Sequence, residues 1–146
     1  MIPNKQHWEK AWMGQGEANA FDHFHGKTLE EAEGMIHDHS EYYCEDFWWM
    51  PEIPFRFYCN AFKKYLTSPR SKDNCYAANS FIVLIEHLLE YKYDWIEDSW
   101  QSIAYVLNRL ADHQDFYNYL TKPGKFRKSV DRIMAKQAIK KGSAGP

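Results

Sequence analysis

The chain has 146 residues, a formal net charge of −2 and 45% hydrophobic residues, which is the usual size and composition of one folded domain. Aromatic residues make up 17% of it, so bulky packing is expected and disorder away from the ends is not. No apolar run is long enough to cross a bilayer, and the first ten residues lack the apolar stretch of a signal peptide. We therefore expect a cytoplasmic protein without a membrane partner.

Charge is distributed unevenly along the sequence. Residues 17–52 contain ten acidic residues and one lysine, a net charge of −9, whereas residues 122–141 contain eight basic residues and one aspartate, a net charge of +7. Such runs are typical of solvated helix faces. They are also typical of partner surfaces, because a field of one sign speeds association and selects partners.

Apolar residues recur at three- and four-residue steps, which predicts helix after helix. A first helix is expected over residues 5–13, with Trp8 and Trp12 on one face. The glycine-containing segment 14–16 is expected to end it.

Thr28-Leu29-Glu30-Glu31 has the form of a capping box, which predicts a helix that begins there and ends near His39. Residues 41–50 are expected to be a further helix or an irregular aromatic stretch. Residues 51–54 contain two prolines and are expected to be extended, because proline disfavours helix in the residue before it. Pro54 then suits the first position of a helix over residues 55–66.

Residues 67–73 form the clearest predicted loop. A central helix with a broad apolar stripe is expected from Asn74, and a helix with apolar residues at seven-residue spacing follows it. Segment 116–120 is expected to be a short helical piece, and a last helix is expected over residues 125–140. The expected inward side chains of that last helix are Phe126, Val130, Ile133, Met134 and Gln137.

These elements predict an all-α, single-domain irregular bundle of about six to seven helices over residues 1–141. Residues 142–146 are expected to be a disordered tail or residues left over from cloning. Cys44, Cys59 and Cys75 are odd in number and far apart, so they predict neither a disulfide framework nor a zinc site. We interpret them as small buried hydrophobic residues.

Histidines raise the question of a metal site. His23 and His25, and His37 and His39, form two His-x-His pairs beside acidic residues. Residues two apart on a helix point about 200° apart, so one pair cannot serve one ion unless its segment is extended. The sequence also lacks the Glu-x-x-His pairs of a di-iron bundle and the HExxH motif. We therefore predict no metal site and no cofactor.

Catalytic motifs are equally scarce in the sequence. It has no GxSxG elbow, no P-loop and no GxGxxG fingerprint, so no catalytic residue is assigned. The enzymatic alternative is a metal-dependent hydrolase that uses the histidine- and acid-rich segment 22–46. The basic face of the last helix is a nucleic-acid signal, but the slightly acidic chain disfavours that partner.

The block over residues 42–66 is the most distinctive part of the sequence. A helical stripe through Phe55, Tyr58, Phe62 and Tyr65 predicts core packing. The aromatics among the acids just before it predict either a clamp on that core or a protein-binding hot spot. The residues assigned to partner binding are Tyr42, Tyr43, Glu45, Asp46, Trp48 and Trp49.

Residues 55–66 read Phe-Arg-Phe-Tyr-x-x-Ala-Phe-x-x-Tyr-Leu. This motif resembles that of a family of small uncharacterised bacterial all-α proteins, which often carry Leu-Pro where this chain has Cys59-Asn60. The resemblance covers roughly residues 20–120 and supplies no catalytic residues. It implies a toxin–immunity role. This resemblance, the acidic segment with its aromatic residues, the small helical scaffold and the lack of catalytic motifs lead to one hypothesis, a non-enzymatic protein-binding module, in its narrower form an immunity protein whose acidic-aromatic surface neutralises a toxin with a basic surface.

Overall fold

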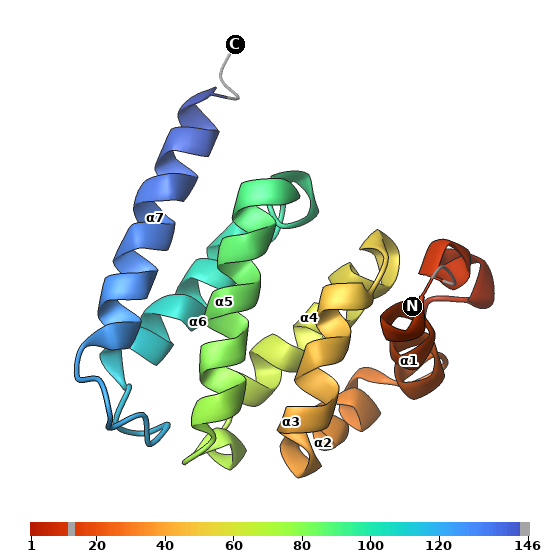
Figure 1. Ribbon diagram of the computed structural model, residues 1–146, viewed down its shortest axis with the longest axis horizontal. Helices are drawn as coiled ribbons and strands as arrows, with labels where there is room; N and C mark the ends of the chain where they lie inside the picture. The colour runs from red at the N-terminus through yellow and green to blue at the C-terminus, as the bar shows by residue number, and fades with distance from the viewer. Residues whose placement is uncertain (12–13, 144–146) are drawn as a thin grey trace. The chain divides into compact units, whose positions relative to one another are not determined.

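The computed structural model describes residues 1–11 and 14–143. Every element in these residues is helical, which confirms the all-α prediction (Figure 1). The chain divides into two compact units, Met1–Ser71 (unit 1) and Lys72–Pro146 (unit 2), each taken in turn below.

Unit 1 combines α-helices with short 3₁₀ segments. Residues 5–11 form a 3₁₀ helix instead of the expected α-helix; Trp8 is fully buried, and Trp12 lies outside the described residues. The expected stop at residues 14–16 is wrong, because Gly14 is the extended N-cap of α1. The elements of unit 1 are η1 (Lys5–Ala11), α1 (Gln15–Phe24), α2 (Leu29–Asp38), α3 (Ser40–Tyr43), η2 (Cys44–Trp49), α4 (Glu52–Leu66) and η3 (Pro69–Ser71).

The start of α2 forms as the sequence predicts. Thr28 Oγ1 accepts a hydrogen bond from the Glu31 amide at 3.0 Å, and the Glu31 carboxylate accepts one from the Thr28 amide at 2.9 Å. Each side chain thus satisfies a backbone N–H that the helix leaves unpaired. The capping box is confirmed, and α2 ends at Asp38, next to the expected end.

The start of α4 differs from the prediction. Residues 52–54 are helical rather than extended, with Pro51 as the N-cap, so Pro54 occupies the third helical position instead of the first. The first four amides of a helix have no intrahelical acceptor, so a proline there removes no hydrogen bond. This tolerance outweighs the preference of the preceding residue for extended backbone.

Aromatic side chains from several elements build the core of unit 1. Tyr58, Phe62 and Tyr65 of α4 are buried, which confirms the core stripe read from the sequence. Phe47 packs on Phe62 at 4.9 Å and on Phe24 at 5.5 Å between ring centroids. The Tyr58 hydroxyl donates toward the backbone oxygens of Phe24 and Lys27, at 2.7 and 2.8 Å, so the end of α1 is fixed to α4.

In unit 2, α7 packs against both α5 and α6 (Figure 1). Asn74 caps α5 by accepting a hydrogen bond from the Ala77 amide at 3.1 Å. The predicted helical piece at 116–120 is wrong: 113–118 form turns, Asn118 has a φ of 61°, and Leu120 is exposed. The elements of unit 2 are α5 (Cys75–Tyr91), η4 (Tyr93–Trp95), α6 (Trp100–Asp112) and α7 (Lys125–Ser143).

The last helix matches the expected inward face in part. Phe126, Val130 and Ile133 are buried, whereas Met134 and Gln137 are half-buried. The backbone of α7 continues through Gly142 and Ser143, two of the five residues of the expected tail, and residues 144–146 lie outside the described range.

A charge clamp joins α5 to α7. The Glu86 carboxylate accepts hydrogen bonds from Arg132 Nε and Nη2 at 2.7 and 2.8 Å, and from Lys136 Nζ at 3.0 Å. These contacts, the Arg132 hydrogen bonds above all, lower the pKa of Glu86 from 4.5 to about 2. Bidentate pairing of this kind is stronger than an ordinary surface ion pair.

Glu86→Gln is expected to lower the free energy of unfolding by about 1–2 kcal/mol at neutral pH, less than the full pKa shift implies because solvent screens the exposed cations. Folding lowers the pKa of Glu86, so its contribution is complete above pH 4.5 and is lost as the pH falls toward 2. Denaturant unfolding at several pH values measures this. The difference between the wild type and Glu86→Gln should shrink with acidification; a constant difference, or an equal one in the exposed control Glu90→Gln, contradicts the clamp.

Candidate protein-binding surface

In the 3₁₀ segment η2 residues three apart share a face, which places Cys44 with Phe47 and Glu45 with Trp48, while the third face holds the buried Asp46 and the exposed Trp49. Cys44 and Phe47 point inward and are 2% and 1% exposed. Glu45 and Trp48 share another face, and both are exposed. Burial raises the pKa of the Cys44 thiol to about 12, so this residue stays neutral and packs as a small apolar group.

Three large aromatic side chains are exposed within eight residues. Tyr42 is 58% exposed, Trp48 36% and Trp49 43%. Together with Glu45 they make up what we call the aromatic–acidic surface. Exposed aromatic rings beside polar groups are enriched at the centres of protein interfaces, whereas an aromatic clamp on the core would bury them.

Residues of helix α1 pack against two of these exposed aromatic rings. A Cβ placed on Gly16 would lie 2.5 Å from the Trp49 ring, so the absence of a side chain at Gly16 lets the indole lie directly on the helix. The His23 ring packs 4.7 Å from the Tyr42 ring. Two of the exposed aromatics are therefore held by neighbouring elements, which lowers the entropy that binding must remove.

Asp46 and Tyr43 belong to the support and not to the exposed set. Asp46 is 4% exposed, and its Oδ2 lies 2.7 Å from Nδ1 of His23 on α1. Burial raises the pKa of Asp46, and the hydrogen bond with His23 opposes that effect. Tyr43 is half-buried and packs against Phe24 and His39. The pairing of His23 with Asp46 joins positions far apart in sequence, so no local pattern could indicate it.

The structure separates the two His-x-His pairs. His23 bonds Asp46, while His25 stacks on Phe21 at 4.6 Å between ring centroids. His37 lies 3.4 Å from the Tyr65 hydroxyl, and His39 lies near Tyr43. Across residues 1–11 and 14–143, no three His, Cys, Asp or Glu side chains come together in a way that could hold an ion. The hydrolase alternative therefore gains no site from this geometry.

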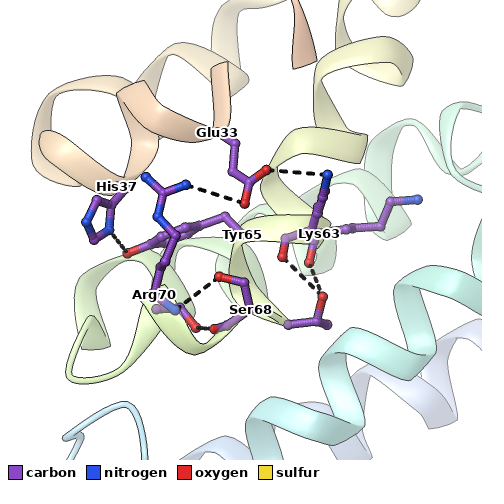
Figure 2. A network of polar contacts seen from close by, with 9 residues as sticks. Glu33, His37, Lys63, Tyr65, Ser68 and Arg70 are labelled. Atoms are coloured by element: carbon purple, nitrogen blue, oxygen red, sulfur yellow. Dashed lines mark hydrogen bonds and ion pairs between the residues drawn. The ribbon is translucent and has the colours of Figure 1, made fainter. Parts of the chain in front are cut away.

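A second polar cluster surrounds Glu33 on α2. Its side chain is 8% exposed and lies 3.8 Å from Arg70 Nη1 (Figure 2). Lys64 Nζ lies 3.9 Å from the same carboxylate. The Arg70 amide donates to Ser68 Oγ at 3.1 Å, which fixes the turn that carries the guanidinium. The cluster ties α2 to α4 and η3. Sequence reasoning missed it, although the three-residue step from Glu33 to the buried Ile36 was the available signal.

Only some of the acidic side chains in segment 17–52 contribute charge to the surface. Glu31 closes the capping box, Glu33 and Asp46 are buried, and Glu52 pairs with Arg56 at 2.8 Å. The acids that remain exposed include Asp22, Glu30, Asp38, Glu41 and Glu45. Two of these, Glu41 and Glu45, lie within the same short stretch as the exposed aromatics.

Many basic side chains of α7 pair with groups of unit 2. Arg132 and Lys136 hold Glu86, and Arg127 pairs with Asp112 and Asp131. Lys125 Nζ donates to the Tyr119 hydroxyl at 3.0 Å, and Lys140 Nζ donates to the Glu90 backbone oxygen at 3.4 Å. These contacts favour the interpretation of the basic run as a helix face that complements acids of its own unit.

Comparison with protein-family models, with curated proteins and with solved structures finds no match for this chain. The family resemblance at residues 55–66 therefore stays a prediction. No helix in the described residues is both long and apolar enough to span a bilayer.

Proposed function

We propose that this protein is a non-enzymatic protein-binding module and that the aromatic–acidic surface contacts its partner. The observation that carries the proposal is the exposure of Tyr42, Trp48 and Trp49 on a segment whose inner residues Cys44 and Phe47 anchor it to the core. Aromatic side chains lose little conformational entropy on binding and supply large contact areas, so they are common anchors of interfaces.

The charge around these rings indicates a partner with a basic surface. Glu41 and Glu45 are exposed beside the aromatics and are acceptors for lysine or arginine side chains. Exposed charges of this kind mainly accelerate encounter and select against acidic partners. In its narrower form, the proposal is an immunity protein that covers the basic surface of a cognate bacterial toxin.

The test begins with affinity capture of a partner by the full chain, followed by binding kinetics with the purified partner. Trp48→Ala and Trp49→Ala are each expected to weaken binding by about 2 kcal/mol, roughly 30-fold, mainly through faster dissociation. Glu41→Lys and Glu45→Lys are expected to slow association instead, and this loss should shrink as salt rises because exposed charges are screened.

Two glycine substitutions test whether the position of the Trp49 ring matters for binding, without removing the ring. Gly16→Ala places a methyl group against the Trp49 ring and should also speed dissociation, because the indole must move. Gly14→Ala is the matched control, since its added Cβ meets only the flexible end of Glu17. Tyr91→Ala removes an exposed aromatic side chain that is not part of the aromatic–acidic surface, and it should leave binding unchanged.

Circular dichroism decides which variants retain the wild-type fold and can be compared. Unchanged association and dissociation in every folded tryptophan and glutamate variant would exclude this segment from the interface and overturn the proposal. Equal losses in Tyr91→Ala would overturn it as well, because the effect would then not belong to this surface.

A further inference from the structure

Unit 2 contains an open groove of about 720 Å³, and all of its lining residues belong to this unit. It is formed by η4, the turn that follows it, the first turn of α6 and the last part of α7. Its volume lies within the roughly 300–1,000 Å³ that is usual for small-molecule sites. No catalytic or metal-site prediction from the sequence uses these residues.

Two half-buried aromatic rings, Tyr93 and Trp100, line the groove. Gln137 Nε2 donates to the Tyr93 hydroxyl at 2.9 Å, which ties the tyrosine on η4 to α7. One aromatic wall is therefore fixed before any ligand arrives, and a fixed wall reduces the entropy lost on binding.

The polar lining combines donors and acceptors. Glu97 and Asp98 supply carboxylates, Gln101 supplies both an amide N–H and a carbonyl, and Lys141 supplies an ammonium group. The two carboxylates would repel an anionic ligand, and a cationic ligand would pair with the carboxylates but could not use the lysine. A purely apolar ligand would strip water from these groups without replacing their hydrogen bonds, which is unfavourable.

A neutral sugar satisfies all of these conditions. Each hydroxyl both donates and accepts a hydrogen bond, so it suits carboxylate, amide and ammonium neighbours, while the C–H face of the ring is apolar and packs on Tyr93 or Trp100. We propose that this groove binds a neutral carbohydrate of one or two rings. The proposal does not depend on the protein-binding function, because it uses no residue of the aromatic–acidic surface.

The test is a titration of the ¹⁵N-labelled protein with neutral mono- and disaccharides based on glucose, galactose, mannose and N-acetylglucosamine, followed by NMR. The Trp100 indole resonance is assigned by its loss in Trp100→Phe. At least one neutral sugar is expected to shift this resonance at millimolar concentration. Trp100→Ala should weaken that binding about tenfold or more, and Glu97→Gln several-fold, because each removes one side of the sugar contact.

Tyr105→Ala is the matched control, because Tyr105 is an exposed aromatic of α6 that does not line the groove. It should leave sugar binding unchanged. Glu97 is exposed, so Glu97→Gln tests the site even if Trp100→Ala fails to fold. The proposal is overturned if no neutral sugar shifts the Trp100 resonance, if glucuronic acid or glucosamine binds more tightly than every neutral sugar, or if Glu97→Gln and the folded Trp100 variants bind like the wild type.

Discussion

Leu88→Ala is expected to lower the free energy of unfolding by about 2–5 kcal/mol, the largest effect predicted for a single change in unit 2. Leu88 is 4% exposed on α5, where Ile85 and Leu89 are also buried. Truncation removes the apolar transfer energy of the side chain and leaves a space that the packed helix can only partly close. Denaturant unfolding followed by circular dichroism measures the loss.

Val83 on the same helix gives the matched control, because it is 46% exposed. Val83→Ala should change the free energy of unfolding by about 0.5 kcal/mol or less, as is usual for surface positions. If Leu88→Ala cost less than about 1 kcal/mol, or no more than Val83→Ala, the inward face of α5 would be wrongly assigned.

Local and periodic signals account for the parts of the fold that the sequence predicted. The capping box at Thr28 and the apolar stripe of α5 each depend on residues three or four apart, and both are confirmed. The start of α4 differs from the prediction, because Pro54 lies in the first helical turn, where proline removes no hydrogen bond, and this outweighs the preference of the preceding residue for extended backbone.

Contacts distant in sequence explain what the pattern could not reveal. The segment 14–16 looked like a helix stop, yet Gly16 lies within α1 and lacks a Cβ where the Trp49 ring packs. The sequence alone indicates that Asp46 is a surface acid, whereas in the fold it lies against His23. The sequence therefore indicated the stretch that carries the exposed aromatic residues but could not distinguish these from the buried residues that support them.

The motif at residues 55–66 gains a physical explanation from the fold. Phe55, Tyr58, Phe62, Tyr65 and Leu66 are all buried, and the Tyr58 hydroxyl also holds the end of α1. Because these motif residues are buried, a resemblance based on them is informative about packing and fold. The exposed aromatics that support the proposed function lie outside the motif, so the two should respond differently to mutation: motif residues through stability, and Trp48 and Trp49 through binding.

The contact between Asp46 and His23 should be the strongest single polar support of the aromatic–acidic surface. Asp46→Ala is expected to lower the free energy of unfolding by about 2–3 kcal/mol, because it removes a buried charge-assisted hydrogen bond and leaves the His23 nitrogen without its acceptor. Glu45→Ala, at the exposed neighbouring position, should change it by about 0.5 kcal/mol or less.

Asp46→Asn separates charge from hydrogen bonding, since the amide oxygen still accepts a bond from His23 but the side chain cannot ionise. Burial raises the pKa of Asp46 above its ordinary value of 3.8, so the folded chain holds this proton more tightly than the unfolded chain does. That contribution is complete below pH 3.8 and is lost as the pH rises through the folded pKa. The stability of the wild type relative to Asp46→Asn should therefore decrease as the pH rises above 3.8. Denaturant unfolding across acidic pH measures it. A relative stability that increases over this range would show that the hydrogen bond with His23 outweighs the effect of burial on the pKa of Asp46. Equal losses in Asp46→Ala and Glu45→Ala would show that Asp46 does not support the surface from a buried position.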